Sequence, residues 1–285
     1  MFEKVTGSLA YRLPYFYRHL VKFKTRPKIE RKVFPAATIV MMTGKNYLTM
    51  SSMSLLSMIK AWDSLPRLVV MGDGTISVPE IKNKISFWPG ELLIEDWGVT
   101  AAYHSGKKRN ALLEYADHHP FGKKLAVILR YAEQSPVVWI DSDVLFFDNF
   151  TPFIPQKRDG WACGGSEDFE AAYHHQVLRL LGSNFHDQYK FNAGVLYVSG
   201  EGIYEQFDLE QVLAKIHPDY DFCTEQSIFA QIASGSLGVL WSGNVIRNFN
   251  ADNQQIKAMP VDKIIARHYT SNVRHLFWRD AFFHI

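Results

Sequence analysis

Two aspartates separated by one residue, Asp141 and Asp143, are the side chains of this sequence that most clearly indicate chemistry. Apolar residues run from 137 to 140 directly into the pair and resume at 144, as in a buried strand. Because side chains alternate along a strand, we expect both carboxylates to project on one side while Ser142 points away. Two neighbouring carboxylates repel each other and are costly to bury. A hard divalent cation, Mg²⁺ or Mn²⁺, would offset both costs and would usually also carry substrate phosphates.

Two other interpretations of the aspartate pair remain open at this level. The carboxylates could simply be solvated in a turn after the strand. The segment also fits the nucleophile motif of haloacid-dehalogenase-type phosphatases, in which Asp141 would attack a phosphate and Asp143 would act as acid and base beside Mg²⁺. That motif normally follows the first strand of its fold, whereas about half of this chain precedes it. The later acidic pair of such phosphatases has only a poor substitute in Asp219 and Asp221.

The elements around the aspartates predict a sheet whose edge would position them. The elements expected before the pair are strands at residues 38–42, 67–71 and 91–95 and helices at 48–62, 76–86, 107–118 and 122–133. Alternating helices and apolar strands are typical of an α/β fold with a mainly parallel sheet covered on both faces. Ligands of such sheets bind beyond the carboxyl ends of the strands. Thr43, Asp73 and the aspartates would all lie at that edge, which favours a ligand site over a solvated turn.

Polar residues of the second half could face the same edge. The elements expected there are a strand at residues 194–199 and helices at 205–216 and 225–233. Asn192 and small residues precede the strand, so that a backbone can approach a ligand closely. Glu225 and Gln226 begin the last of these helices, with Thr224 as its expected N-cap. Taken alone, a segment like that around Asn192 is more often simply a turn that leads into a strand. A segment like that around Glu225 is more often simply the N-terminal cap of a helix.

A third polar segment lies near the C-terminus. His268 could ligate a metal, and Arg274 could pair with a phosphate. A lone histidine is more often structural, so this segment is weak evidence by itself. The order of all these segments along the chain is more specific than any one of them.

In that order, the segments resemble the GT-A nucleotide-sugar glycosyltransferases, specifically the family 8 retaining enzymes that include glycogenin and bacterial lipopolysaccharide galactosyltransferases. The resemblance runs from Thr38 to about Trp278. Its markers are Thr43 with Asn46 and Tyr47, Lys124 with Leu125, Asp141-Ser142-Asp143, residues 191–195, Glu225 with Gln226, and His268 with Arg274. The resemblance implies a GT-A, Rossmann-like, mainly parallel sheet with helices on both faces.

The resemblance also implies a function, which is metal-dependent transfer of a sugar from a nucleotide-diphosphate sugar. Asp141, Asp143 and His268 would hold Mn²⁺ or Mg²⁺, which neutralises charge on the departing diphosphate. A uridine diphosphate sugar is the family's usual donor. The residues implied to bind donor and metal are Thr43, Asn46, Tyr47, Asp73, Lys124, Asp141, Ser142, Asp143 and Arg274.

The catalytic residues that the resemblance implies are Asn192, Glu225 and Gln226, which match positions around the donor sugar. Such enzymes are thought to retain anomeric configuration by front-face attack, with the leaving phosphate accepting the proton of the acceptor. No strong general base is then required, and Glu225 could instead stabilise an oxocarbenium-like centre.

The sequence departs from the family pattern at two places. The family commonly has Asp-Gln where Glu225 and Gln226 stand, and a lysine where Arg274 stands. An arginine preserves the charge but changes the geometry. These departures leave the donor sugar open, and the acceptor could be a carbohydrate, a lipid-linked sugar or a protein. A glycosyltransferase-like protein that binds a sugar nucleotide without turnover is a further alternative, although the retained metal residues argue against it.

Composition narrows the class of protein. The chain has 285 residues, 47% of them hydrophobic, which is ample for a core. A net charge of only +2 argues against general nucleic-acid binding. Cys163 and Cys223 lack metal-ligand spacing and are expected to be reduced thiols, which favours the cytoplasm. No linker divides the chain after Pro35, so we expect an N-terminal extension at 1–35 and one GT-A domain at 36–285.

The N-terminal extension is basic and aromatic. Eight basic residues and one acid lie between Arg12 and Lys32, with aromatic residues interleaved. Residues 11–32 could therefore make peripheral contact with an anionic membrane surface. The alternative is an arm packed on its own domain or on the second subunit of a homodimer. The sequence shows neither the apolar core of a signal peptide nor an apolar run long enough to span a membrane.

Overall fold

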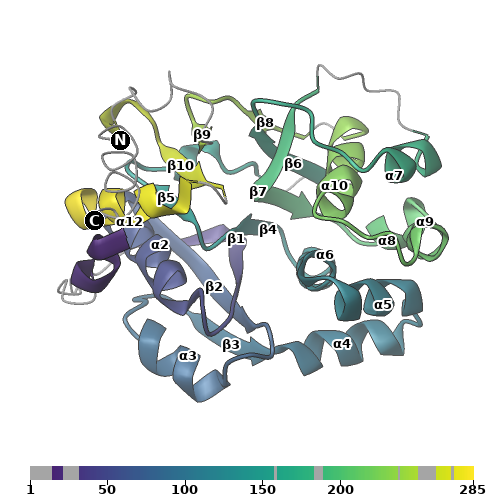
Figure 1. Ribbon diagram of the computed structural model, residues 1–285, viewed down its shortest axis with the longest axis horizontal. Helices are drawn as coiled ribbons and strands as arrows, with labels where there is room; N and C mark the ends of the chain where they lie inside the picture. The colour runs from purple at the N-terminus through teal and green to yellow at the C-terminus, as the bar shows by residue number, and fades with distance from the viewer. Residues whose placement is uncertain are drawn as a thin grey trace, which may run out of the picture.

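The main sheet has seven strands in the order β3-β2-β1-β4-β7-β6-β8 (Figure 1). The computed structural model describes residues 15–21, 32–156, 159–182, 189–236, 238–249, 261–270 and 273–285. The strands are β1 (Lys32–Thr43), β2 (Ser64–Gly72), β3 (Leu92–Asp96), β4 (Val137–Ile140), β6 (Ala162–Glu167), β7 (Phe191–Ser199) and β8 (Leu240–Trp241). β1, β2, β3 and β4 run parallel, as do β6 and β8, whereas β7 is antiparallel to β4 and β6. The expected mainly parallel sheet is confirmed.

A smaller sheet stands beside the main one and has the order β5-β10-β9. It consists of β5 (Val144–Phe146), β9 (Ile246–Phe249) and β10 (Ala266–Tyr269). β10 pairs antiparallel with β5, which places His268 opposite Val144, the residue that follows the aspartate pair. A segment more than a hundred residues downstream is thereby joined to the aspartates.

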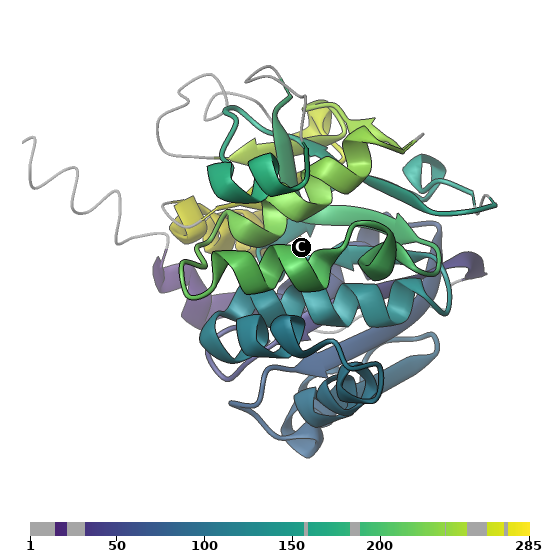
Figure 2. The same ribbon diagram turned by 90° about the vertical axis from the view of Figure 1, so that its right-hand side faces the viewer.

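Helices cover both faces of the main sheet, and Figure 2 shows the teal and green helices in front of the strands. The helices are α2 (Leu48–Ala61), α3 (Val78–Ile85), α4 (Trp97–Gly106), α5 (Asn110–His118), α6 (Pro120–Ala132), α7 (His175–Leu180), α8 (Ile203–Gln206), α9 (Leu209–Ile216), α10 (Thr224–Ser234) and α12 (Arg274–His284). α5, α6, α9 and α10 bury their apolar sides with one face of the sheet. α2 and α3 pack on the opposite face, together with the small sheet.

The apolar run of β4 is continuous because the strand is covered on both faces. Val137 and Trp139 belong to the core under α6, whereas Val138 and Ile140 belong to the core under α2. All four side chains are buried, as expected for a central strand with helices on both faces. This burial leaves Asp141 as the first residue that can turn away from the core.

Several local predictions differ from the structure. The sequence pattern did not indicate α4, and the helix expected from residue 107 begins only at Asn110, after a turn in which Lys108 adopts φ 59°. The helix expected at 205–216 is interrupted where Asp208 adopts φ 46°, giving α8 and α9. Thr224 is not an N-cap. It is the first residue of α10, and its hydroxyl accepts a hydrogen bond from the Asp221 backbone N–H at 3.0 Å.

Candidate functional site

Asp141, Asp143 and His268 meet at the carboxyl end of β4. One ligand atom from each lies within 4.8 Å of the others, which makes the three a possible metal-binding group. His268 Nε2 is 3.3 Å from Asp143 Oδ1 and 4.0 Å from Asp141 Oδ2. Two carboxylates and one imidazole form a donor set suited to Mn²⁺, and Mg²⁺ also favours the carboxylates.

The backbone geometry of the aspartate pair differs from the prediction. β4 ends at Ile140, and Asp141-Ser142-Asp143 form a turn in which the Val144 N–H donates to the Asp141 carbonyl at 3.3 Å. Strand alternation therefore does not bring the carboxylates together. The tight turn and the return of the chain into β5 do so instead.

The orientation of the His268 ring is fixed from behind. Asn248 Nδ2 donates to the Glu167 carbonyl at 2.7 Å, so its Oδ1 must be the atom that faces His268 Nδ1 at 2.8 Å. An amide oxygen accepts, which places the imidazole hydrogen on Nδ1 and directs Nε2 toward the aspartates. A histidine held in this way by a second residue is a common arrangement at metal sites.

Gly194 provides the space that the His268 ring occupies. A Cβ atom at this position would lie 2.3 Å from Cε1 and 2.4 Å from Nδ1 of the ring. The Gly194 carbonyl also accepts a hydrogen bond of 2.8 Å from the Asp141 N–H. Residue 194 thus needs to be glycine because the strand passes directly against the imidazole.

Asp141 is held by two donors from the sheet and from α6. Trp139 Nε1 donates to Asp141 Oδ1 at 2.7 Å, and Lys124 Nζ lies 3.3 Å from the carboxylate. Lys124 is buried and also donates to the Ala193 carbonyl at 2.8 Å. These contacts fix one face of the carboxylate and leave it half-buried at the sheet edge.

Glu225 lies behind Lys124 and is 1% exposed. Its Oε1 is 3.4 Å from Lys124 Nζ, an ion-pair distance without good hydrogen-bond geometry. Burial raises the pKa of Glu225 to about 7 although Lys124 opposes the shift. For Lys124, burial disfavours the charged form, but the charges of Asp141 and Glu225 outweigh it and raise its pKa. The ammonium therefore remains charged between two carboxyl groups.

Asp143 is paired with His268 and Arg274. Arg274 Nε donates to Asp143 Oδ2 at 2.8 Å, on the side away from His268. Burial of Asp143 opposes its ionisation, but the hydrogen bond from His268 and the charge of Arg274 prevail and hold its pKa at about 2. Burial likewise opposes protonation of His268, and the hydrogen bond with Asp143 overcomes it and raises the histidine pKa. Asp143 is thus an ionised carboxylate at any ordinary pH.

Asn192 and Gln226 lie on the β7 side of the site. Asn192 Nδ2 donates to Asp168 Oδ2 at 2.7 Å, and the Gly194 N–H donates to Asn192 Oδ1 at 2.8 Å. Gln226 Nε2 donates to the Ala172 carbonyl at 2.9 Å. Both amides are therefore fixed in orientation. Asn192 lies within β7 and does not precede it as expected, whereas Gln226 lies beside the strand and accepts from the Ala193 N–H at 3.4 Å.

The residues expected at the ends of β1 and β2 lie close to one another and to Arg274. The Asp73 N–H donates to the Thr43 carbonyl at 2.9 Å, and Thr43 is buried while Asn46 and Tyr47 are exposed. The Arg274 guanidinium lies 5.6 Å from the centre of the Tyr47 ring. Arg274 consequently connects this part with the aspartates. Ser142, which lies between the two aspartates in the sequence, is half-buried.

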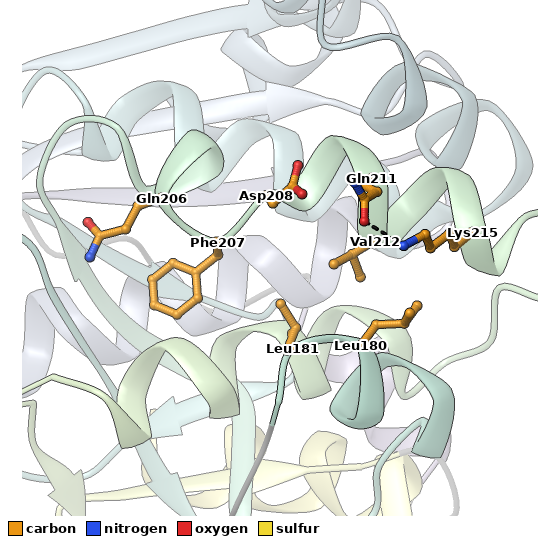
Figure 3. Close-up of a pocket in the computed structure, with 8 residues that line it drawn as sticks. All are labelled: Leu180, Leu181, Gln206, Phe207, Asp208, Gln211, Val212 and Lys215. Atoms are coloured by element: carbon orange, nitrogen blue, oxygen red, sulfur yellow. Dashed lines mark hydrogen bonds between the residues drawn. The ribbon is translucent and has the colours of Figure 1, made fainter.

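The sequence did not indicate Asn248, Trp139 or Asp168 as residues of the site. Each acts on a predicted residue through a side-chain contact. Elsewhere, a pocket at α7, α8 and α9 contains none of the site residues (Figure 3). It is lined by Leu180, Leu181, Gln206, Phe207, Asp208, Gln211, Val212 and Lys215. We assign no role to it, because its lining has no group of metal ligands and no buried unpaired carboxylate among the described residues.

The fold is that of the GT-A glycosyltransferases, which confirms the resemblance at the level of structure. Mouse xyloside xylosyltransferase 1 in its apo form superposes with a TM-score of 0.59 at 12% identity, covering 83% of this chain and 98% of that chain. The galactosyltransferase LgtC in complex with donor and acceptor sugar analogues gives a TM-score of 0.54 at 17% identity, covering 82% and 87%.

A third similar structure is the apo form of the bifunctional glycosyltransferase WbbM, with a TM-score of 0.60 at 13% identity. The match covers 91% of this chain and 52% of WbbM, so the chain spans about half of that protein. No protein-family model matches the sequence, and no curated protein matches it either. At these identities the likeness concerns the fold, and the chemistry has to be argued from the site.

Proposed function

We propose that the protein transfers a sugar from a nucleotide-diphosphate sugar, with a uridine diphosphate sugar as donor, in a metal-dependent reaction. The observation that carries the proposal is the convergence of Asp141, Asp143 and His268 at the ligand-binding edge of a glycosyltransferase fold. The fixed ring of His268 and the ionised state of Asp143 support metal binding. Asp143 already presents lone pairs, and His268 would present one once its Nε2 proton is released to the solvent as the ion binds.

Asp141, Asp143 and His268 would hold Mn²⁺ or Mg²⁺, with Ser142 in the turn between the aspartates. The bound ion would supply Lewis-acid stabilisation of the departing nucleoside diphosphate. Arg274, which donates to Asp143 in this structure, would exchange this partner for a donor phosphate, which a guanidinium binds well. Tyr47 beside Arg274 supports a nucleotide pocket formed with Thr43, Asn46 and Asp73.

Asn192 and Gln226 would position the donor sugar from the β7 side. Their amides are fixed by Asp168 and by the Ala172 carbonyl, which supports an orienting role. The burial of Glu225 favours an indirect role, in which it holds Lys124 against Asp141. Retention of anomeric configuration is part of the proposal, since we see no exposed general base among the described residues that contact the metal group.

The buried, unpaired thiols of Cys163 and Cys223 support a reducing compartment such as the cytoplasm for this reaction. The proposed activity is tested by incubating the protein with Mn²⁺ and a panel of nucleotide sugars and measuring release of nucleoside diphosphate. We expect slow donor hydrolysis that is lost in Asp143→Asn and retained in the control Asp148→Asn, whose carboxylate caps Asn149 instead.

Two results would contradict the proposal. Hydrolysis of phosphate monoesters without turnover of any nucleotide sugar would indicate a phosphatase. Metal-dependent binding of a nucleotide sugar without release of diphosphate, with carbohydrate, lipid-linked and protein acceptors alike, would indicate a binding protein.

A further inference from the structure

The described part of the N-terminal segment packs on the last helix of the chain. Residues 15–20 form a helix. The Tyr17 ring stacks on Phe282 with centroids 4.9 Å apart and meets Phe283 edge-on at 5.3 Å. Val21, which follows the helix, is 1% exposed. Figure 1 shows this purple helix beside the yellow α12, so residues 15–21 and the C-terminal helix form one surface.

This surface exposes large apolar rings next to positive charge. Phe16 is 59% exposed and Phe283 is 60% exposed, and Arg18 and His19 are also exposed. The Arg18 guanidinium lies 5.4 Å from the centre of the Trp278 ring, which keeps its charge close to the aromatic rings. We call Phe16, Arg18, His19 and Phe283 the terminal patch. Tyr17 links the two exposed rings, since Phe16 precedes it in the sequence and Phe283 meets its ring edge-on. Large apolar rings exposed in this way are typical of interaction surfaces.

Charge distinguishes between the partners that could cover the terminal patch. The sequence between Arg12 and Lys32 has eight basic residues and one acid. A two-fold contact would place the patch of one copy against the same patch of another and bring the Arg18 charges of the two copies close together. An anionic lipid surface would instead attract each lysine and arginine and accept the exposed rings at its interface.

We propose that the terminal patch docks on an anionic lipid bilayer, with Phe16 and Phe283 inserted at the interface and Arg18 among the headgroups. None of the helices in the described part of the chain is both long and apolar enough to cross a bilayer. The contact is therefore peripheral in this part of the molecule, and it combines apolar anchors with basic charge, as stable surface binding requires.

The position of α12 gives this contact a consequence for the active site. α12 begins at Arg274, which contacts Asp143, and ends at His284 beside the terminal patch. A helix of 11 residues is about 16 Å long at 1.5 Å per residue. A bilayer at the patch would thus lie within reach of the site, which suits a lipid-linked acceptor. This consequence rests on the proposed function, whereas the docking itself does not.

The test is sedimentation of the 285-residue chain with vesicles of phosphatidylcholine alone or with about 30% phosphatidylglycerol, so that the two kinds of vesicle differ in anionic charge. We expect binding to the anionic vesicles that weakens with added salt. Phe16→Ser with Phe283→Ser should lower the partition coefficient by about 10- to 100-fold, from the area of the two rings that leaves water. Phe222→Ser is the matched control, since Phe222 is 70% exposed at another place.

The outcomes separate the possible partners. Absence of the wild-type chain from the anionic pellet, or an equal loss in the Phe222→Ser control, would overturn the proposal. A dimer that the double variant converts to a monomer, with vesicle binding unchanged, would assign the patch to a second copy. Thermal unfolding of Phe16→Ser alone checks that the loss does not come from misfolding. Donor hydrolysis measured without vesicles should be unchanged in these variants, so failure here is distinguishable from failure of the proposed function.

Discussion

Substitution of Gly194 by alanine should disable the proposed metal site by direct steric displacement of His268. The added Cβ would lie 2.3 Å from the ring, whereas ordinary contact begins near 3.4 Å. The strand cannot yield easily, because the Gly194 carbonyl is bonded to the Asp141 N–H and Val195 pairs with Ile140. The ring must then move by about 1 Å, several times the error of about 0.2 Å that a metal–ligand distance tolerates.

The expected result is a loss of about 10- to 100-fold in Mn²⁺ affinity, because changes to the groups that orient a metal-binding histidine typically weaken metal binding by this factor. Isothermal titration with Mn²⁺ alone, without a nucleotide sugar, measures this affinity directly. Overpacking should also lower the free energy of unfolding by about 1–3 kcal/mol, so urea titration must show that the variant is folded under the assay conditions.

Gly164→Ala is the matched control, because its Cβ would lie 2.4 Å from the Val239 carbonyl oxygen in the same sheet without touching His268. It should be destabilised to a similar degree and bind Mn²⁺ as the wild type does. A folded Gly194→Ala variant with wild-type Mn²⁺ affinity would refute the reasoning, since the ring would then have no part in holding the metal.

Three other predictions follow from the structure. Asn248→Ala should lower Mn²⁺ affinity by about 10- to 100-fold by releasing the ring of His268, and an unchanged titration would contradict this role. Asp280→Asn removes the buried charge that faces Arg267 at 3.1 Å and should lower the free energy of unfolding by about 3–5 kcal/mol in urea; a change below about 1 kcal/mol would count against it. Burial lowers the pKa of His104 to about 4, so the unfolded chain, with its histidine near 6.5, binds the proton first. The contribution of His104 to the free energy of unfolding should be fully present above pH 6.5, and the free energy of unfolding should fall by at most about 3 kcal/mol toward pH 4. His104→Gln should flatten this part of the curve, and parallel curves for the two proteins would show that other groups are responsible.

The central strands and the aspartate pair could be predicted from sequence because their signals are local. Apolar runs that end in polar turns gave β1, β2 and β4, and the burial of these strands on both faces explains why the runs are continuous. Asp141 and Asp143 belong to one short motif, so their proximity does not depend on the rest of the fold. His268 was predicted only through the resemblance to a family, since a single histidine has no local signal.

The residues that the sequence did not reveal depend on distant contacts. Asn248 reaches His268 because β9 and β10 pair in register, and Asp168 reaches Asn192 across the pairing of β6 with β7. The breaks at Lys108 and Asp208 also lack a sequence signal, since neither residue is glycine although both have positive φ. Helical periodicity continues through both positions. For this reason the start of α5 was predicted too early, and α8 and α9 were predicted as one helix.

The coupling of α12 to β10 explains how the C-terminal segment completes the site. Arg267 and Tyr269 project from β10 toward Asp280 of α12, with contacts of 3.1 and 2.5 Å, while His268 between them points to the aspartates. Asp280 therefore fixes the helix and the strand together. Since α12 begins with Arg274, the same connection sets where the guanidinium meets Asp143. The proposed metal ligand His268 and the proposed phosphate-binding residue Arg274 are thus positioned by one buried carboxylate, and displacement of α12, for example by a contact at its far end, would move both at once.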